Sequence, residues 1–260
     1  MDSFFGNVRG GNLNRYSHFA PRIDWIRQFL ELKDNFFTKN NLGSVMVRFF
    51  KRFLLDADLI YKNCLCSSTT DKICKLGIDS NLAWGIIVVN LSIGSPLVRW
   101  YFRRVIFDEN YSKLCLLKMI EDYGSKGGPD IVSALAQMCN LPLGNIGFGK
   151  CIYNRKNFAS ITRHKWEEPS DLIVLYSLYK FAEVSGWQYG FKFEKLFDNS
   201  EAEVVSPVQI FGIDEKSMSN IINGLAVNYP DFISAAFSLD IQSVKLNPLK
   251  NSMDVLELIA

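Results

Sequence analysis

The chain has 260 residues, of which 48% are hydrophobic and 13% aromatic. This composition excludes a disordered chain and indicates a well-packed globular protein. The longest apolar run lies within residues 82–90, far short of the roughly 20 residues needed to cross a bilayer. The N-terminus has no apolar signal core. We therefore expect a cytoplasmic protein with no membrane contact.

The net charge of +2 hides an asymmetry. Residues 1–105 contain 15 Lys and Arg against 8 Asp and Glu, and residues 106–260 contain 14 against 19. The first part therefore has a balance of +7 and the second a balance of −5. A basic N-terminal part favours an anionic partner there, and an acidic remainder should repel one.

Residues 1–78 predict a basic winged-helix-like domain. Helices are predicted from Arg22, over Asn35–Lys39 and over Ser44–Leu55. The last follows a Leu-Gly-Ser turn in which Ser44 would be the N-cap. Leu59–Lys62 and Lys72–Leu76 would then pair as a small wing. Three helices followed by two short strands is the winged-helix order.

The third of these helices carries the candidate binding residues. Its apolar residues, among them Phe49, Phe50 and Phe53, recur at helical spacing, and basic residues fall away from that stripe. A packed face with a basic outer face suits the recognition helix of a helix-turn-helix. The alternative is an ordinary solvated basic face on a core helix. The predicted DNA contacts are Lys39, Asn40, Ser44, Arg48, Lys51 and Arg52.

Residues 79–165 predict a helical middle. Helices are expected over Asn81–Leu91, Pro96–Ile106, Asn110–Tyr123 and Pro129–Cys139. Leu141–Arg155 predicts a strand and a turn, and Thr162–Lys165 an exposed loop.

Residues 166–260 predict a second winged-helix-like domain. The expected elements are a helix over Ser170–Val184, a short element at Phe193–Phe197, a strand at Val208–Phe211, a helix over Asp214–Ala226, and a hairpin of Ile233–Leu239 with Ile241–Leu246. The helix after Asp214 has one base against two acids, which favours contact with protein over phosphate. The predicted fold class is therefore mainly α with small β-wings, as two winged-helix-like units around a helical middle.

The sequence contains no recognisable pattern for catalysis, cofactor binding or metal binding. Among six cysteines only Cys64 and Cys66 are close, and the C-x-C spacing is not that of usual zinc sites. We expect reduced thiols, with Cys115 and Cys139 as small core residues and a structural zinc as the alternative. No phosphate-binding loop, nucleophile elbow or metalloprotease motif occurs. We expect a protein that is not an enzyme and has no catalytic residue, cofactor or metal.

Three segments together resemble the domain-of-unknown-function family 4007. Ser17–Ile26 is similar to the opening of that family, with Tyr16 standing where the family has its His. Leu42–Ile60 and Ser206–Met218 resemble two later blocks in the same order. Members accompany genes for phosphoadenosine-phosphosulfate-reductase-like proteins in bacterial DNA sulfur-modification and phage-defence islands.

The resemblance implies a non-enzymatic, DNA-directed or adaptor role. We therefore expect an accessory protein that binds duplex DNA in a bacterial DNA-modification or phage-defence system. The expected protein partner is a phosphoadenosine-phosphosulfate-reductase-like or other defence protein. The alternative function is a protein adaptor that holds a sulfurtransferase-like partner through the acidic C-terminal half.

Overall fold

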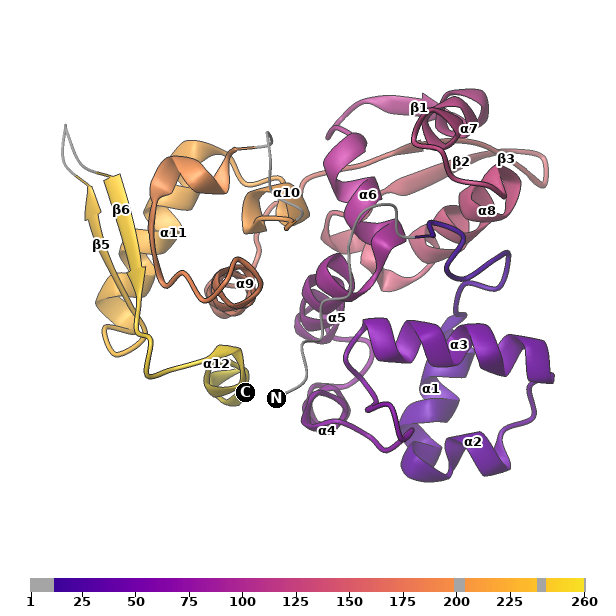
Figure 1. The fold of residues 1–260 in the computed structure, drawn as a ribbon, viewed down its shortest axis with the longest axis horizontal. Helices are drawn as coiled ribbons and strands as arrows, with labels where there is room; N and C mark the ends of the chain where they lie inside the picture. The colour runs from indigo at the N-terminus through magenta and orange to yellow at the C-terminus, as the bar shows by residue number, and fades with distance from the viewer. Residues whose placement is uncertain (1–11, 199–203, 238–241, 260) are drawn as a thin grey trace.

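Helix α5 (Asn81–Gly94) is the central element of the protein (Figure 1). The computed structural model describes residues 12–198, 204–237 and 242–259. Every residue of α5 from Ala83 to Ser92 is buried, because helices from all parts of the chain pack around it. The Asn90 side chain connects α5 to two of them, since its Nδ2 donates to the Ala57 carbonyl at 3.1 Å and its Oδ1 accepts from Tyr176 Oη at 2.7 Å.

The N-terminal helices pack through an aromatic core. They are α1 (Ile23–Leu32), a 3-10 turn (Lys33–Asn35), α2 (Phe36–Lys39), α3 (Ser44–Asp56) and α4 (Ser68–Leu76). Rings of Trp25, Phe29, Phe36 and Phe53 surround the fully buried Phe50, at centroid distances of 5.4–6.4 Å. The helices α1 to α3 therefore form one packed unit.

The wing predicted after α3 is wrong. Lys72–Leu76 is helical because it belongs to α4, whose N-cap Ser67 accepts a hydrogen bond from the Thr70 backbone N–H. Of the other predicted strand, only Ile60 pairs, in an isolated bridge with Cys66. No sheet therefore lies in the described residues of the predicted first winged-helix-like domain.

The predicted helical middle contains a sheet. Its elements are α6 (Pro96–Arg104), β1 (Asn110–Ser112), α7 (Lys113–Asp122), α8 (Gly128–Cys139), a 3-10 helix (Pro142–Ile146), β2 (Lys150–Asn154) and β3 (Asn157–Thr162). The strands form an antiparallel sheet in the order β1-β3-β2. Residues 110–112 are therefore a strand and not the predicted start of a helix, because they pair with the end of β3.

The C-terminal part contains the second sheet. Its elements are α9 (Asp171–Val184), β4 (Gly190–Lys192), a 3-10 helix (Phe193–Leu196), α10 (Pro207–Phe211), α11 (Glu215–Asn228), β5 (Ile233–Phe237), β6 (Gln242–Leu246) and α12 (Ser252–Leu258). The predicted hairpin is confirmed as β5 and β6, and residues 238–241 lie outside the described residues. The strand predicted at Val208–Phe211 is wrong, because Ser206 and Gln209 form a capping box that starts α10.

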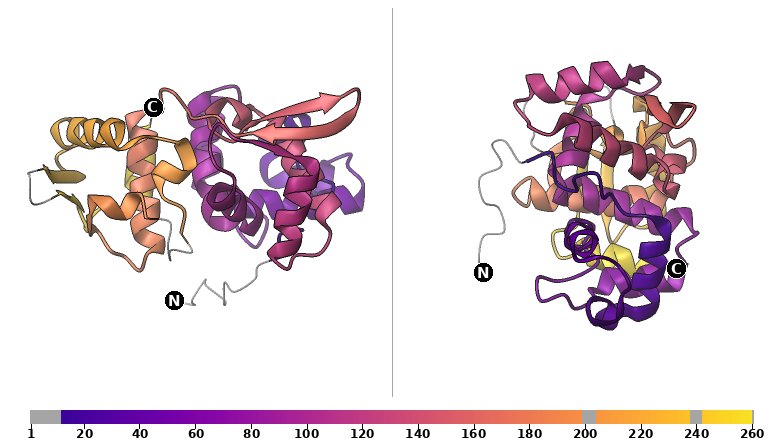
Figure 2. Two further views of the ribbon diagram at one scale, coloured as in Figure 1. Left: turned by 90° about the horizontal axis from the view of Figure 1, so that it is seen from above. Right: turned by 90° about the vertical axis from the view of Figure 1, so that its right-hand side faces the viewer.

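The two sheets follow one plan. In each, a helix precedes a short edge strand, three helical elements follow, one of them a 3-10 helix, and a hairpin closes the sheet. The strand orders, β1-β3-β2 and β4-β6-β5, place the last strand in the centre both times. Figure 2 shows the C-terminal elements at one end of the molecule and the N-terminal helices with the β2–β3 hairpin at the other. The protein is thus mainly α with two small antiparallel sheets.

Arg163, at the end of β3, joins the two sheet-bearing parts. Its guanidinium is fully buried and donates hydrogen bonds to five backbone carbonyls, with no carboxylate among these acceptors. The acceptors belong to α6, the loop before β2, and α10: Phe102, Val105, Gly147, Gln209 and Ile210. Burial lowers the pKa of Arg163 to about 10. The exposed loop predicted here is therefore wrong at Arg163.

No single helix among the described residues is long and apolar enough to span a membrane. The helices α5 and α6 have the required length and composition only as a pair, and the chain bends by 97° between them.

Candidate nucleic-acid interface

The C-terminal end of α3 is fixed by a buried carboxylate. Asp56 Oδ2 and Oδ1 accept from Arg15 Nε and Nη2 at 2.8 and 2.6 Å, and Tyr16 Oη donates to Oδ2 at 2.7 Å. Burial raises the pKa of the Asp56 carboxyl, and the hydrogen bond to Asp56 raises the pKa of Arg15. The bidentate pair ties the segment before α1 to α3 and neutralises a carboxylate at the negative end of a helix.

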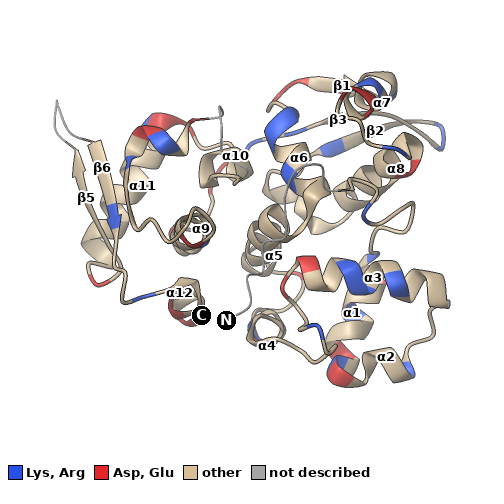
Figure 3. Ribbon diagram, in the orientation of Figure 1, with Lys and Arg blue, Asp and Glu red and all other residues tan. Residues whose placement is uncertain are grey.

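The predicted basic residues lie along α3 (Figure 3). Arg48 is exposed, and its guanidinium carbon lies 4.9 Å from the centroid of the Phe49 ring. Lys51 Nζ lies 5.9 Å from the Phe37 ring. Arg52 is half-buried, 5.3 Å from the Phe49 ring, and its Nη1 donates to the Arg15 carbonyl at 3.3 Å. Each of these three cations therefore lies within cation–π distance of an aromatic ring.

Arg48 and Lys51 have no acidic partner in the described part of the chain, whereas the positive charge of Arg52 acts on the nearby Asp56 carboxylate. The ion pairs of the N-terminal helices use other residues, such as Arg27 with Asp79 at 3.1 Å and Lys33 with Asp71 at 3.0 Å. Arg48 and Lys51 make no ion pair with a described carboxylate. Their positive charge is therefore available to an external anion.

The turn before α3 holds the remaining predicted residues. Lys39 is exposed at the end of α2. Asn40 shapes the turn, since its Nδ2 donates to the Phe36 carbonyl at 2.9 Å and its Oδ1 accepts from the Leu42 N–H at 3.0 Å. The predicted N-cap is wrong: Gly43 occupies that position, and Ser44 is the first helical residue, exposed, with no capping bond from its side chain.

A second basic element, which the sequence analysis missed, is the β2–β3 hairpin. Lys150, Arg155 and Lys156 are exposed on it, and the last two form its tip. Tyr153, 40% exposed, lies on the same strand as Lys150. The available signal was Asn-Arg-Lys-Asn between two runs of strand-forming residues, a turn that carries two bases. Figures 2 and 3 show this hairpin at the same end of the molecule as α3.

The cysteines are all free thiols. Cys115, predicted to be a core residue, is exposed on α7, whereas Cys139 is partly buried and lies beside Cys151. No group of three or more His, Cys, Asp or Glu side chains in the described ranges is arranged to hold a metal ion. Both histidines are exposed beside a carboxylate, His18 at 3.6 Å from Asp130 and His164 at 3.5 Å from Asp108.

Comparison with known proteins finds no relative. No family model, no curated protein and no solved structure matches the chain. The candidate interface therefore rests on the residues and contacts described above, and the resemblance of three segments to family 4007 remains a prediction.

Proposed function

We propose that the protein is a non-enzymatic, duplex-DNA-binding accessory protein that contacts DNA through the outer face of α3. The observation that carries this proposal is a row of cations without described acidic partners at a helix-turn-helix junction: the exposed Lys39 and Arg48 and the half-buried Lys51. Lys and Arg side chains that have no acidic partner in the protein can bind DNA phosphates and so release counterions from the DNA. The half-buried Arg52 extends the row toward the C-terminal end of α3.

The packing of α1 to α3 supports the proposal. A recognition helix must keep one face in the core while the other reaches the groove. The α3 helix is 13 residues long, and its inward side chains Phe50, Phe53 and Leu54 are fully buried. Asp56 and Arg15 hold its far end. The outer face can therefore meet DNA without loss of core contacts.

The two sheet-bearing parts are winged-helix-like units in this proposal. Their shared element order and central last strand support that assignment. In the first of them, the β2–β3 hairpin would be a basic wing that contacts the DNA backbone through Arg155 and Lys156. The winged-helix-like units would thus lie in residues 79–165 and 166–260, and the first 78 residues would supply a helix-turn-helix.

The second candidate function is a protein adaptor that uses the C-terminal unit. In the position of a recognition helix, α11 exposes Ser217, Asn220, Asn223 and Val227, the last at 78%. Asp214 and Glu215 precede this face. A helix face with one base, Lys216, beside two acids suits packing and hydrogen bonding to protein better than phosphate contact. By the resemblance, the partner would be a phosphoadenosine-phosphosulfate-reductase-like or other defence protein.

The test is the affinity of the full chain for a fluorescent duplex, measured by anisotropy at low salt. The double variant Arg48→Ala, Lys51→Ala should weaken binding by at least about tenfold, since each charged contact contributes substantially. The matched control, Lys216→Ala with Lys245→Ala, removes two exposed cations of the C-terminal unit and should change the affinity by less than about twofold. Equal losses in both variants would contradict the placement on α3.

A further pair of variants separates α3 from the hairpin. Arg155→Ala with Lys156→Ala should also weaken binding, but less than the α3 pair, because a wing contacts the backbone at the edge of the interface. If only the hairpin variant loses duplex binding and the α3 variant keeps it, α3 is not the main DNA contact. Capture of a defence protein by the full chain, abolished by Asn220→Arg and unaffected by the α3 pair, would favour the adaptor.

A further inference from the structure

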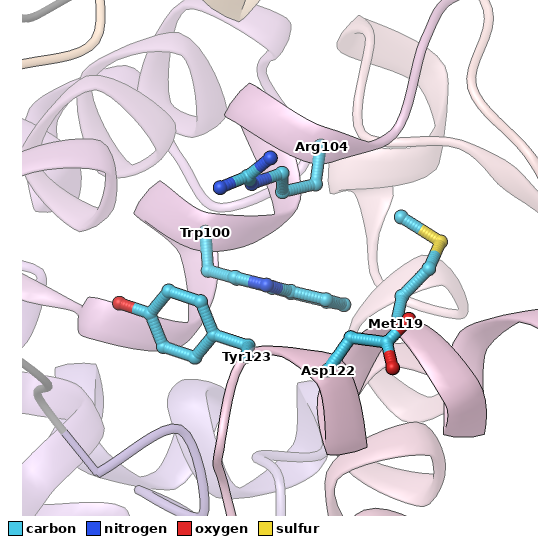
Figure 4. A pocket seen from close by; sticks show the side chains of 5 residues that line it. All are labelled: Trp100, Arg104, Met119, Asp122 and Tyr123. Carbon is cyan, nitrogen blue, oxygen red and sulfur yellow. The ribbon is translucent and has the colours of Figure 1, made fainter.

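A hollow of about 330 Å³ lies between α6 and α7 (Figure 4). It is lined by Trp100 and Arg104 of α6 and by Met119, Asp122 and Tyr123 at the end of α7. Neither helix belongs to the α3 interface. In Figure 1, α7 lies at the top of the molecule and α3 below. The size is that of the smaller ligand sites of proteins.

The floor of the hollow is aromatic. Trp100 is 4% exposed, so its indole is held by the core. The Tyr123 ring meets it edge to face, with centroids 6.4 Å apart and planes at 61°. Met119 Sδ, which accepts from the Cys115 thiol at 3.9 Å, gives a polarizable thioether on the other side. A fixed indole beside a tyrosine and a methionine suits a planar apolar group.

The rim carries one cation and one anion that do not pair. Arg104 and Asp122 are both exposed, and neither makes an ion pair with a described residue. Figure 4 shows the Arg104 side chain on one side of the indole and Asp122 on the other. A guanidinium fork binds a phosphate with two parallel hydrogen bonds, and a carboxylate accepts hydrogen bonds from an amino group.

We propose that this hollow binds a nucleotide with an exocyclic amino group. The base would lie against the exposed ring of Tyr123, which the buried Trp100 indole holds in place, its amino group would donate to Asp122, and its phosphate would meet Arg104. A small inorganic anion would make no contact with the aromatic rings, and an uncharged aromatic ligand would make no contact with Arg104 or Asp122. The shared chemistry fits a free mononucleotide or an unpaired nucleotide of a strand.

The primary test is isothermal titration calorimetry of the full chain with AMP. Binding of AMP is expected, with weaker binding of adenosine, which lacks phosphate, and of inorganic phosphate, which lacks a base. Arg104→Ala should weaken AMP by about tenfold or more, the loss of a charged hydrogen-bonded contact. Arg103→Ala is the matched control, since Arg103 is exposed on the same turn and does not line the hollow. It should change the affinity by less than about twofold.

Three further measurements complete the test. Asp122→Asn should reduce the preference for AMP over UMP, whose base has no exocyclic amino group. Trp100→Phe keeps a ring in a buried position and should weaken AMP less than Tyr123→Ala with Met119→Ala. A comparison of AMP with a short oligo-dA strand identifies the source. Binding of the strand, with sensitivity to Arg104→Ala, assigns an unpaired nucleotide, and binding of AMP alone assigns a free one.

Several results would overturn the assignment. The assignment fails if neither AMP nor the strand binds, or if phosphate binds as tightly as AMP. It also fails if Arg104→Ala and Arg103→Ala change the affinity for AMP equally. The Arg48→Ala, Lys51→Ala variant should bind AMP as the wild type does. Failure of duplex binding through α3 is therefore distinguishable from failure of the nucleotide site.

Discussion

Replacement of Arg163 should destabilise the fold more than any change on the surface. Arg163→Met removes the donors of five hydrogen bonds, at 2.8 to 3.3 Å, to backbone carbonyls of three segments. Each buried carbonyl left without a donor costs about 1–3 kcal/mol. The neutral Met side chain also avoids the cost of burying a cation, which is several kcal/mol and offsets part of this loss. We expect a net loss of about 3–5 kcal/mol, a large part of the 5–15 kcal/mol that stabilises a typical protein.

Arg163→Lys should be intermediate. A lysine ammonium has three donors and cannot reproduce the planar fork, so a loss of about 2–3 kcal/mol is expected. Arg103→Met is the matched control, because Arg103 is exposed on α6, and it should change stability by less than about 1 kcal/mol.

The assay is urea unfolding followed by circular dichroism, with thermal melting as a second measurement. The order of stability should be wild type and Arg103→Met first, then Arg163→Lys, then Arg163→Met. An Arg163→Met protein as stable as the Arg103→Met control would refute the reasoning that the guanidinium joins the two sheet-bearing parts.

Three further outcomes follow from single contacts. Gly94→Ala should lose about 1–3 kcal/mol in urea unfolding, because the added Cβ would overlap the Asp56 carbonyl; unchanged stability would contradict the close packing of α5 on α3. Burial and the Asp34 hydrogen bond raise the pKa of Cys66 to about 12. Alkylation of Cys66 at pH 8, followed by mass spectrometry, should therefore be about a thousandfold slower than that of an ordinary thiol. The Asp34→Asn variant should react faster than the wild type. The hydrogen bond from the Ser217 backbone N–H lowers the pKa of Asp214. The ionised Asp214 carboxylate therefore stabilises α11 above about pH 3.9, and this stabilisation is lost as the pH falls through the pKa of Asp214 in the folded protein. Asp214→Asn should therefore melt with a smaller decrease in Tm between pH 5 and pH 2 than the wild type.

Local signals predicted the helices well where the apolar spacing was strong. The spacing of Phe49, Phe50 and Phe53 predicted which side of α3 is buried. The strands predicted at Lys72–Leu76 and Val208–Phe211 were wrong because their apolar runs were given more weight than the helix starts beside them. Those starts are the Ser67 N-cap in one case and the Ser206–Gln209 capping box in the other, and they decide the local structure.

Tertiary contacts were beyond the reach of such signals. Arg163 stands between polar neighbours and was predicted to be exposed, yet the five carbonyls that bury it come from segments 16 to 61 residues away. The short strand β1 exists because it pairs with the end of β3, since three residues have no stability alone. The prediction of a strand and a turn over Leu141–Arg155 included β2 but not its partner β3, so the basic tip between them was not recognised as a hairpin.

The salt dependence of duplex binding tests the DNA proposal most directly. If Lys39, Arg48, Lys51 and Arg52 contact phosphates, log K should fall with log salt at a slope of about −3 to −4 in the full chain. Arg48→Ala should reduce that slope by about one. Affinity for a duplex should therefore be measured across a salt series for both proteins. A flat response, or no binding at low salt, would contradict the proposal and favour the adaptor.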